Sequence, residues 1–385
     1  MIGLLPALGT TLAALEASGQ LERCQVEWRV YAGAFGGARW FGYGREGATF
    51  AIRVPGKPVE WAVAMGRPWW VPSARSWALL MPLARDFRAC SALRVLNLTG
   101  VIPALIARDL WGLPYVLQVG YDAPAVARAH GKRVRAWFLR HLQDLAVQRA
   151  TGVIYASSAL LDADGQRGLF ASRHRAKDAI RLQGRFTVIP NGVDLEHFRP
   201  LWRCPSGKSQ RRVVYVGRLS REKNLDLLAA ACQRVGATLH LFGAGPLAAE
   251  LAALPVVTAY GPVPHYSLPA ILADMDCFAM VSETEGSSKA VLESMATGLP
   301  CILSEGASRG LGPWNPAKPA WIPAVPALEA ALDGVLGSAE LAQGVGRLGR
   351  ALVEARHDLK KTLRDEIAFV HNAVEGACAK EARQA

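Results

Sequence analysis

The sequence predicts an α/β protein of two domains, each built on a parallel sheet. Its 385 residues exceed what a single hydrophobic core usually supports. The composition, 51% hydrophobic and 20% charged, is that of a globular chain. Short apolar runs alternate with helical patterns along the whole length, which is typical of βαβ units.

Short apolar runs bounded by turn residues predict the strands of the first domain. They lie at residues 2–5, 95–98, 115–119, 153–156 and 187–189. Helical patterns follow several of them, most clearly at residues 11–18 and 133–149. Residues 39–82 are rich in Pro, Gly and Trp, so we expect one or two strands and irregular loops there.

A turn and a linker separate the two halves of the chain. Residues 190–194 are turn formers, and residues 200–212 have the composition of a linker. The predicted strands of the second half lie at residues 213–216, 238–242, 256–259, 277–281 and 301–303. We therefore expect domains at residues 1–199 and 200–360, with residues 361–385 forming a C-terminal helix that crosses back to the first domain.

The positive charge of the chain is concentrated in its first half. The formal net charge is +12, and residues 1–200 hold 25 Lys and Arg against 14 Asp and Glu. This excess indicates that the first half faces something anionic. No recognised nucleic-acid-binding module is present, so nucleic acid is not the expected partner.

The cysteines indicate a cytoplasmic protein with reduced thiols. Their number is odd, and no two stand in a C-x-x-C spacing. We expect each to be a small buried hydrophobic residue. They are Cys24, Cys90, Cys204, Cys232, Cys277, Cys301 and Cys378. No apolar run reaches the roughly 18 residues of a membrane-spanning helix, and the apolar start lacks the positive region of a signal peptide.

The strongest candidate for chemistry follows the predicted strand 277–281. In an open parallel sheet, ligands bind where strands end and helices begin, and a helix N-terminus favours a diphosphate. Glu285 precedes the helix expected at residues 289–297, and three small residues lie between them: Gly286, Ser287 and Ser288. Their small side chains would let a ligand approach the backbone.

A second carboxylate, Glu293, falls inside that helix, about 7.5 Å beyond Ser288 along the axis. Carboxylates accept hydrogen bonds from paired hydroxyls, so the two glutamates are suited to a sugar and a ribose on either side of a diphosphate. The alternative is a surface glutamate before the helix and a solvated one within it. The pattern alone does not decide between them.

Two further loops in the second half also follow predicted strands. In one, Gly217 is followed by Arg218 and Lys223, whose charges could neutralise a diphosphate, while Arg221 is expected to face solvent. Basic loops are common, so this signal is weak alone. In the other, Gly245 and Pro246 partly mimic a dinucleotide fingerprint, and a tight strand-to-helix turn is the alternative.

Together these stretches resemble the family-4 glycosyltransferases, retaining enzymes of the GT-B fold. The matching pieces, in that family's order, are residues 188–194, Gly217-Arg-Leu with Lys223, residues 243–246, and Glu285 with Glu293 followed by residues 295–300. The resemblance covers roughly residues 150 to 303. It implies two facing Rossmann-like domains with a cleft between them.

The resemblance also implies roles for individual residues. Glu285 would contact the transferred sugar, Glu293 the ribose, and Arg218 with Lys223 the diphosphate, so Arg218, Lys223 and Glu285 form the expected catalytic set. Configuration would be retained, and a donor phosphate oxygen would take the acceptor's proton. The expected donor-binding residues are Gly9, Asn191, Gly217, Gly245, Pro246, Gly286, Ser287, Ser288 and Glu293.

Such enzymes usually need neither a metal nor another cofactor. Two D-x-D strings, Asp162 with Asp164 and Asp274 with Asp276, would suit a metal-dependent class of glycosyltransferase. We interpret them instead as solvated carboxylates, because one lies near a loop and the other precedes a buried strand.

The departures from the family pattern lie chiefly in the first domain. Relatives often have a glycine pair after the first strand, where this chain has Gly9 followed by Thr10 and Thr11. Either threonine could simply cap the helix. The histidine that relatives place after a later strand is missing. Asp122 is the nearest polar candidate, and a structural turn aspartate is the alternative, so Thr10 and Asp122 are the acceptor-side candidates. Residues 304–326 also fit the pattern poorly.

The basic half interleaves cations with aromatic residues, at residues 128–149, 67–71 and 75–77. A basic and aromatic surface suits an anionic membrane, in agreement with a glycan or lipid-linked acceptor and a peripheral place at the inner face of the membrane. The alternative is a helix that packs its aromatic residues inward and leaves an ordinary solvated basic face.

Three functions remain open from the sequence. The first is transfer of a sugar from a UDP-, GDP- or ADP-sugar. The second is a catalytically silent GT-B module that binds nucleotide or glycan, which the missing histidine favours and the retained Glu285, Glu293, Arg218 and Lys223 oppose. The third is a sugar-nucleotide epimerase, which product analysis without acceptor would distinguish.

Overall fold

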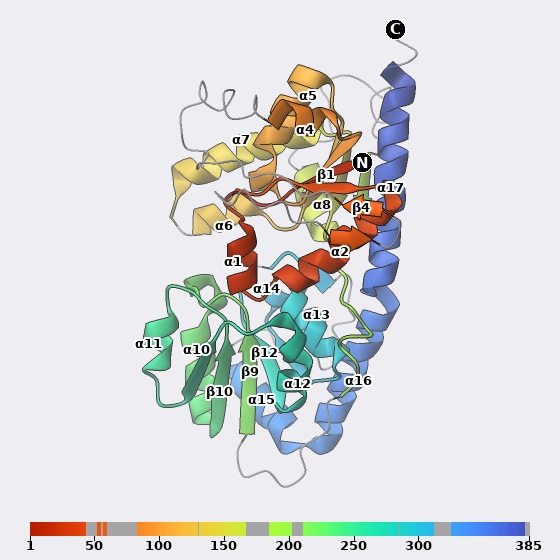
Figure 1. The fold of residues 1–385 in the computed structure, drawn as a ribbon. Coiled ribbons are helices and arrows are strands. Elements are labelled where there is room, and N and C mark those ends of the chain that lie inside the picture. The colour runs from red at the N-terminus through yellow and green to blue at the C-terminus, as the bar shows by residue number, and fades with distance from the viewer. Residues whose placement is uncertain are drawn as a thin grey trace. The chain divides into compact units, whose positions relative to one another are not determined.

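The computed structural model of the chain describes residues 1–43, 52–54, 57–59, 83–129, 131–166, 185–201, 211–283, 285–311 and 325–381. It divides into two compact units (Figure 1). Unit 1 consists of Met1–Ala17, Leu21–Ile189 and Leu363–Ala385, and unit 2 of Ser18–Gln20 and Pro190–Thr362. Several sequence features fall outside the described residues, among them the tryptophan-rich stretches at 67–71 and 75–77, most of the linker, and residues 312–324.

Unit 1 is built on a parallel sheet whose described strands follow the order β2-β1-β5-β6-β7-β8. These strands are β1 (Ile2–Leu5), β2 (Ala38–Trp40), β5 (Ala92–Val95), β6 (Tyr115–Val119), β7 (Gly152–Tyr155) and β8 (Phe186–Val188). A short antiparallel hairpin, β3 (Ile52–Val54) with β4 (Lys57–Val59), falls within the region where one or two strands were expected.

The helices of unit 1 are α1 (Leu12–Ala17), α2 (Leu21–Ala34), α4 (Ala84–Arg88), the short η2 (Leu98–Gly100), α5 (Ile102–Trp111), α6 (Ala123–Ala129), α7 (Arg133–Arg149), α8 (Ser158–Gln166), and α17 (Leu359–Glu381) from Leu363 onward. The ends of α5 follow from its sequence: proline lies in its first turn, and the helix ends at Gly112, which adopts the left-handed conformation. α17, blue in Figure 1, runs beside α2.

Alternating residues of the strands fill two cores, one on each face of the sheet of unit 1. Leu5, Leu93 and Leu117 pack with the cluster that includes residues of α4, α5, α6 and α7. Leu4 and Val116 point to the other face, where residues of α2 and α17 cover them. This alternation is the period of two that a β-strand imposes on its side chains.

The predicted strand 95–98 is wrong by three residues, because β5 is Ala92–Val95. Arg94 interrupts the apolar run and conceals the start of the strand. Asn97, inside the predicted strand, instead accepts a hydrogen bond from the Thr99 N–H and begins η2. Arg94 is fully buried and lies in register between Leu4 and Val116.

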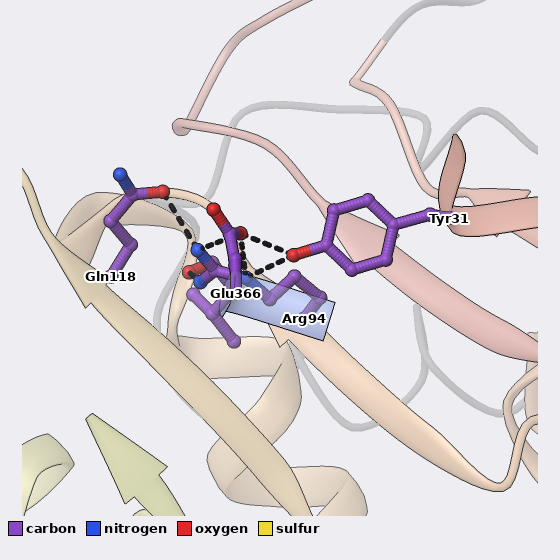
Figure 2. Close-up of polar contacts among 5 residues, drawn as sticks. Tyr31, Arg94, Gln118 and Glu366 are labelled. Carbon is purple, nitrogen blue, oxygen red and sulfur yellow. Dashed lines mark hydrogen bonds and ion pairs between the residues drawn. The ribbon is translucent and has the colours of Figure 1, made fainter. Parts of the chain in front are cut away.

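Figure 2 shows how the buried guanidinium of Arg94 is satisfied. It donates to the Glu366 carboxylate at 2.5 and 2.8 Å, to the Tyr31 hydroxyl at 3.0 Å and to the Gln118 side-chain oxygen at 2.9 Å. Tyr31 also donates to Glu366. Burial, and then the negative charge of Glu366, raise the pKa of Tyr31 well above its usual value. The network ties α17 and α2 to the sheet.

Unit 2 has a parallel sheet of the order β11-β10-β9-β12-β13 in its described part. Its strands are β9 (Arg211–Val216), β10 (Ala237–Phe242), β11 (Val257–Gly261), β12 (Cys277–Met280) and β13 (Cys301–Leu303). Because β9 begins at Arg211, the predicted linker is two residues too long at its end. The sheet otherwise agrees closely with the predicted strands.

The helices of unit 2 are η3 (Arg221–Lys223), α10 (Leu225–Arg234), α11 (Ala248–Ala252), η4 (His265–Ser267), α12 (Leu268–Ala273), α13 (Lys289–Ala296), α14 (Glu305–Ser308), η5 (Arg309–Leu311), α15 (Val325–Gly337) and α16 (Ala339–Arg356). One apolar cluster, which includes Phe278 and Val291, holds sheet and helices together. It also contains Cys232, Cys277 and Cys301, buried free thiols as predicted; Cys90 is buried in unit 1, and Cys24 is half-buried.

Candidate functional site in unit 2

A segment leaves the carboxyl edge of the sheet of unit 2 after each of its described parallel strands, and the four loops of the candidate site follow β9, β10, β12 and β13. Since β9 neighbours both β10 and β12, and β12 neighbours β13, the four loops lie beside one another. This is the edge at which open α/β sheets bind ligands. It holds most of the residues that the sequence predicts for the donor.

The loop after β9 carries the two predicted cations. It begins at Gly217, whose φ of +150° lies in a region that other residues rarely adopt. The Tyr215 hydroxyl donates to the Arg218 carbonyl at 3.0 Å and fixes the turn. The Arg218 side chain is exposed and makes no ion pair with any described residue. Lys223 ends the short helix η3.

Contacts between described residues join this loop to the loop after β12. Asn224, left-handed at φ +50°, donates its side-chain amide to the Val281 carbonyl at 3.1 Å. The Glu283 N–H donates to the Glu222 carbonyl at 3.1 Å. Lys223 forms an ion pair with Glu285, and both side chains are 15% exposed. The predicted cation and the predicted sugar carboxylate are thus in direct contact, and Glu285 is not the surface residue of the alternative interpretation.

Helix α13 begins immediately after this loop. Its N-cap residue, Ser288, makes no side-chain capping bond, so the first N–H groups of the helix are not satisfied from that hydroxyl. Ser287 is 8% exposed, and its hydroxyl has no hydrogen-bond partner among the described residues. Asn191 donates its side-chain amide to the Ser287 carbonyl at 2.7 Å. Asn191 therefore holds the loop in place.

The loop after β13 supports the same segment through two glycines. The Glu285 N–H donates to the Gly306 carbonyl at 3.0 Å. A Cβ on Gly306 would lie 2.0 Å from the Glu283 carbonyl oxygen, and one on Gly310 would lie 1.8 Å from that of Gly286. Residues 304–310 fit the family pattern poorly, yet they hold the candidate site in shape. Glycines shortly after a strand's carboxyl end are the signal that could have identified them.

The glycines after β10 have a comparable packing role. A Cβ on Gly243 would lie 1.9 Å from the Gly217 carbonyl oxygen, and one on Gly245 would lie 2.2 Å from that of Leu219. Leu219 in turn donates its N–H to the Ala244 carbonyl at 3.0 Å. Gly245 and Pro246 thus belong to a tight turn packed on the β9 loop, which is reason enough for glycine there.

Glu293 is buried, 5% exposed, rather than solvated as the alternative interpretation required. Its Oε1 accepts a hydrogen bond from the Nε2 of His265 at 2.9 Å, and His265 is itself buried. The sequence pointed to Glu293 but not to His265. Nothing local to His265 marks it, because its partner lies 28 residues away in the chain.

The remaining predicted residues belong to unit 1. Gly9 is exposed with φ +78°, and no described group crowds it. The Thr10 carbonyl accepts from the Tyr43 N–H at 3.0 Å, while Thr11 caps α1 by accepting from the Ala14 N–H. Asp122 accepts from the Ala125 N–H at 2.9 Å at the start of α6 and lies 3.9 Å from Arg140. Asp122 therefore has at least the structural role considered for it.

Solvation was the wrong interpretation for part of the D-x-D strings. Asp164 is 1% exposed and accepts from the Gln143 amide and the Tyr155 hydroxyl. Asp276 is buried and accepts from the Arg212 N–H, whereas Asp274 pairs with the Arg212 guanidinium. These carboxylates hold helices and strands together. Within the described part of the chain, no three His, Cys, Asp or Glu side chains are grouped to hold a metal ion.

Inward packing of the aromatic residues on α7 was also a wrong alternative. Trp137 is 63% exposed and Phe138 41% exposed, and Val134, one turn earlier, is 82% exposed. The opposite side of the helix, with Ala136 and Leu139, packs on the sheet. Among the described helices, none combines the length and the apolar composition needed to cross a lipid bilayer.

Comparison with known proteins identifies the class to which unit 2 is similar. Residues 210–312 match the family described as "Glycosyl transferases group 1". A GDP-mannose-dependent alpha-mannosyltransferase of Mycolicibacterium smegmatis is 31% identical over 208 residues, covering 52% of this chain and 51% of that protein. A sulfoquinovosyl transferase of Arabidopsis thaliana is 29% identical over 219 residues, covering 53% and 40%. The chain spans about half the length of the mycobacterial relative.

Solved structures extend the likeness over nearly all of the chain. A sucrose-phosphate synthase of Thermosynechococcus elongatus superposes with a TM-score of 0.76 at 16% identity, covering 97% of this chain and 99% of that one. The Anabaena protein HepE, in complex with UDP-glucose, gives a TM-score of 0.69 at 15% identity, covering 97% and 99%. The chain has the α/β GT-B fold, and the predicted resemblance to GT-B glycosyltransferases is confirmed.

Proposed function

We propose that the chain is a retaining glycosyltransferase that moves a sugar from a nucleotide-sugar donor to an acceptor. One observation carries the proposal: Lys223 and Glu285 meet beside the N-terminus of α13, next to a buried serine hydroxyl without a described partner. A cation, a carboxylate and a helix N-terminus are what a sugar diphosphate requires. The match of residues 210–312 to group 1 glycosyl transferases supports the same conclusion.

In the proposed reaction the diphosphate binds to the N-terminus of α13, with Arg218 and Lys223 on its charges. Lys223 is paired with Glu285. A diphosphate competes for Lys223, and Glu285 then accepts hydrogen bonds from hydroxyls of the transferred sugar. The bond from the anomeric carbon to the diphosphate breaks as the bond to the acceptor oxygen forms. The acceptor's proton passes to a phosphate oxygen of the leaving nucleotide.

Charge stabilisation of the leaving diphosphate is the main task of the two cations. Arg218→Ala is expected to lower kcat by about 100-fold while leaving the melting temperature nearly unchanged, because the side chain is exposed. Arg221→Ala is the matched control: it removes an exposed arginine of the same loop and should change turnover little. GDP-mannose is the first donor to test, since the Mycolicibacterium smegmatis relative is named for it. Unchanged turnover in folded Arg218→Ala would remove this role.

We also propose that the reaction needs no metal ion or other cofactor, because the charges of Arg218 and Lys223 take that part. Turnover measured with and without a chelator tests this. Activity that disappears with chelator and returns with a divalent cation would contradict it.

We propose that helix α7 of unit 1 binds the cytoplasmic face of an anionic membrane as a peripheral contact. The acceptor would then be a lipid-linked molecule in that membrane. Val134, Trp137 and Phe138 stand exposed on neighbouring turns of α7, and the exposed cations Arg133 and Arg135 flank them. Apolar side chains beside arginines suit the headgroup region, where rings insert and cations meet phosphates.

Co-sedimentation with vesicles tests this face. The protein is expected to bind phosphatidylglycerol vesicles but not phosphatidylcholine vesicles, and to dissociate at about 1 M salt, where the Debye length is about 3 Å. The double variant Trp137→Ser/Phe138→Ser should lose binding. Tyr266→Ala, which removes an equally exposed aromatic ring of unit 2, should retain it. Equal binding to both vesicle types would end the membrane proposal.

A further inference from the structure

Glu293 was predicted as a site residue, but its buried hydrogen-bond partner His265 was not. Glu293 lies within α13, four residues from its first residue, and the resemblance gives it to the donor ribose. A carboxylate that is 5% exposed needs a partner, because an ionised group taken out of water without one is costly. His265 is such a partner, with 2.9 Å between Nε2 and Oε1.

We propose that His265 is a positioning residue for Glu293, setting the carboxylate for the vicinal hydroxyls of the donor's ribose. The proposal rests on the proposed function. His265 does not touch the nucleotide; it acts through Glu293. A carboxylate offers about four acceptor sites, so one that accepts from His265 can also accept from ribose hydroxyls.

The ring of His265 is itself held in place. Phe198 packs against it edge-on, with ring centroids 5.3 Å apart, and His197 stacks beside it at 5.6 Å. The His265 N–H donates to the Gly19 carbonyl at 3.3 Å, which fixes the backbone of η4. With ring and backbone constrained, Nε2 stays aimed at the carboxylate. Preorganisation of this kind lowers the entropy lost on binding.

A purely structural role is the competing explanation, in which the pair merely ties η4 to α13. Both explanations predict lower stability when His265 is replaced. Only the positioning role predicts that recognition of the ribose hydroxyls is lost selectively. The decisive quantity is therefore the ratio of affinities for a ribonucleotide and its dideoxy analogue, in which general effects on folding or on diphosphate binding cancel.

Calorimetry with GDP, UDP and ADP, each against its 2′,3′-dideoxy form, measures that ratio. Wild type is expected to prefer the ribonucleotide by about 10- to 100-fold, the effect of hydrogen bonds to a charged group. Glu293→Gln and His265→Leu should each reduce the preference to about threefold or less, and the double variant should lose nothing further. His265→Gln, whose amide reaches the position of Nε2, should restore most of the preference.

Further variants keep the test decisive if His265→Leu does not fold. His265→Asn is polar but too short to reach Glu293, so it should behave as the leucine variant does. His240→Gln replaces another buried histidine of unit 2, bonded to Thr238 and Tyr260, and should keep the wild-type ratio. A wild-type ratio in His265→Leu or His265→Asn, or no ribose preference in wild type, would overturn the inference. Failure of wild type to bind any nucleotide would instead count against the proposed function.

Discussion

Arg94 is a buried arginine in a parallel sheet, and its charge requires polar partners from neighbouring elements. It occupies a strand position at which β1 and β6 have leucine and valine. Burial lowers the pKa of its guanidinium, but Glu366 and Tyr31 together outweigh that effect and raise the pKa, so the charge is retained. A buried charge persists only with such partners. Glu366 therefore makes the C-terminal segment part of the sheet's core.

Neutralising Glu366 leaves the Arg94 charge buried without its counter-ion. Glu366→Gln is expected to lower the free energy of unfolding of unit 1 by about 3–5 kcal/mol. The matched control is Asp109→Asn, which breaks an exposed ion pair with Arg149 in the same unit and should cost less than about 1 kcal/mol. Urea unfolding monitored by a unit 1 probe gives both values. Equal losses would show that the buried pair is not a special requirement.

At the scale of elements, the candidate site is a set of loops that fit because glycine backbones meet. Gly243 packs on the β9 loop, and Gly306 and Gly310 pack on the β12 loop. Each loop follows a neighbouring strand, so the parallel sheet brings them together and the glycines let them close. The loop that carries Glu285 and Ser287 depends on these contacts for its conformation.

Adding a methyl group at Gly310 tests this dependence. The Cβ would lie 1.8 Å from the Gly286 carbonyl oxygen, so the backbone of the site must move. Gly310→Ala is expected to weaken nucleotide-sugar binding at least tenfold and to lower the melting temperature. Gly344→Ala, in α16 with open space at its Cβ, should stabilise by about 0.5–1 kcal/mol and leave binding unchanged. Calorimetry and thermal unfolding measure both; intact donor affinity in Gly310→Ala would contradict the expectation.

The two ends of the main segment of unit 2 are joined to each other. Val193 and Asp358 form a β-bridge, and the Val193 N–H donates to the His357 carbonyl at 2.8 Å. The Nδ1–H of His357 donates to the Asn191 carbonyl at 2.9 Å. Asn191 also holds Ser287, so this closure reaches the candidate site.

The buried ring of His357 makes the stability of unit 2 depend on pH. Burial lowers the pKa of His357 below its ordinary 6.5, so the folded ring stays neutral where the unfolded ring takes up a proton. Stability is therefore lost as pH falls below about 6.5, by at most about 1.4 kcal/mol per pH unit for this group. Burial also lowers the pKa of His240, so this residue likewise reduces stability as the pH falls. His357→Asn, which can still donate to Asn191 but cannot titrate, should flatten the curve between about pH 7 and pH 5. Parallel curves in urea titrations would contradict this.

Local patterns in the sequence predicted the fold class, the strand series of both halves and the segments that surround the candidate site. These depend on periodicity and turn chemistry, which neighbours along the chain encode. The prediction failed locally at β5, where a buried arginine replaced an apolar residue. The carboxylate that stabilises this arginine, Glu366, lies 272 residues away in the chain, so no local pattern reveals the pair.

The use of the candidate residues follows from how distant segments pack together. In the folded chain Lys223 pairs with Glu285, and the Asn191 amide donates to the Ser287 carbonyl. Glu293 is buried against His265, and Asp164 and Asp276 are buried as well. Each outcome depends on which distant segments the sheet brings together and on how much water they exclude. A carboxylate has the same identity in the sequence whether it is solvated or buried, and the difference arises only when the chain packs around it.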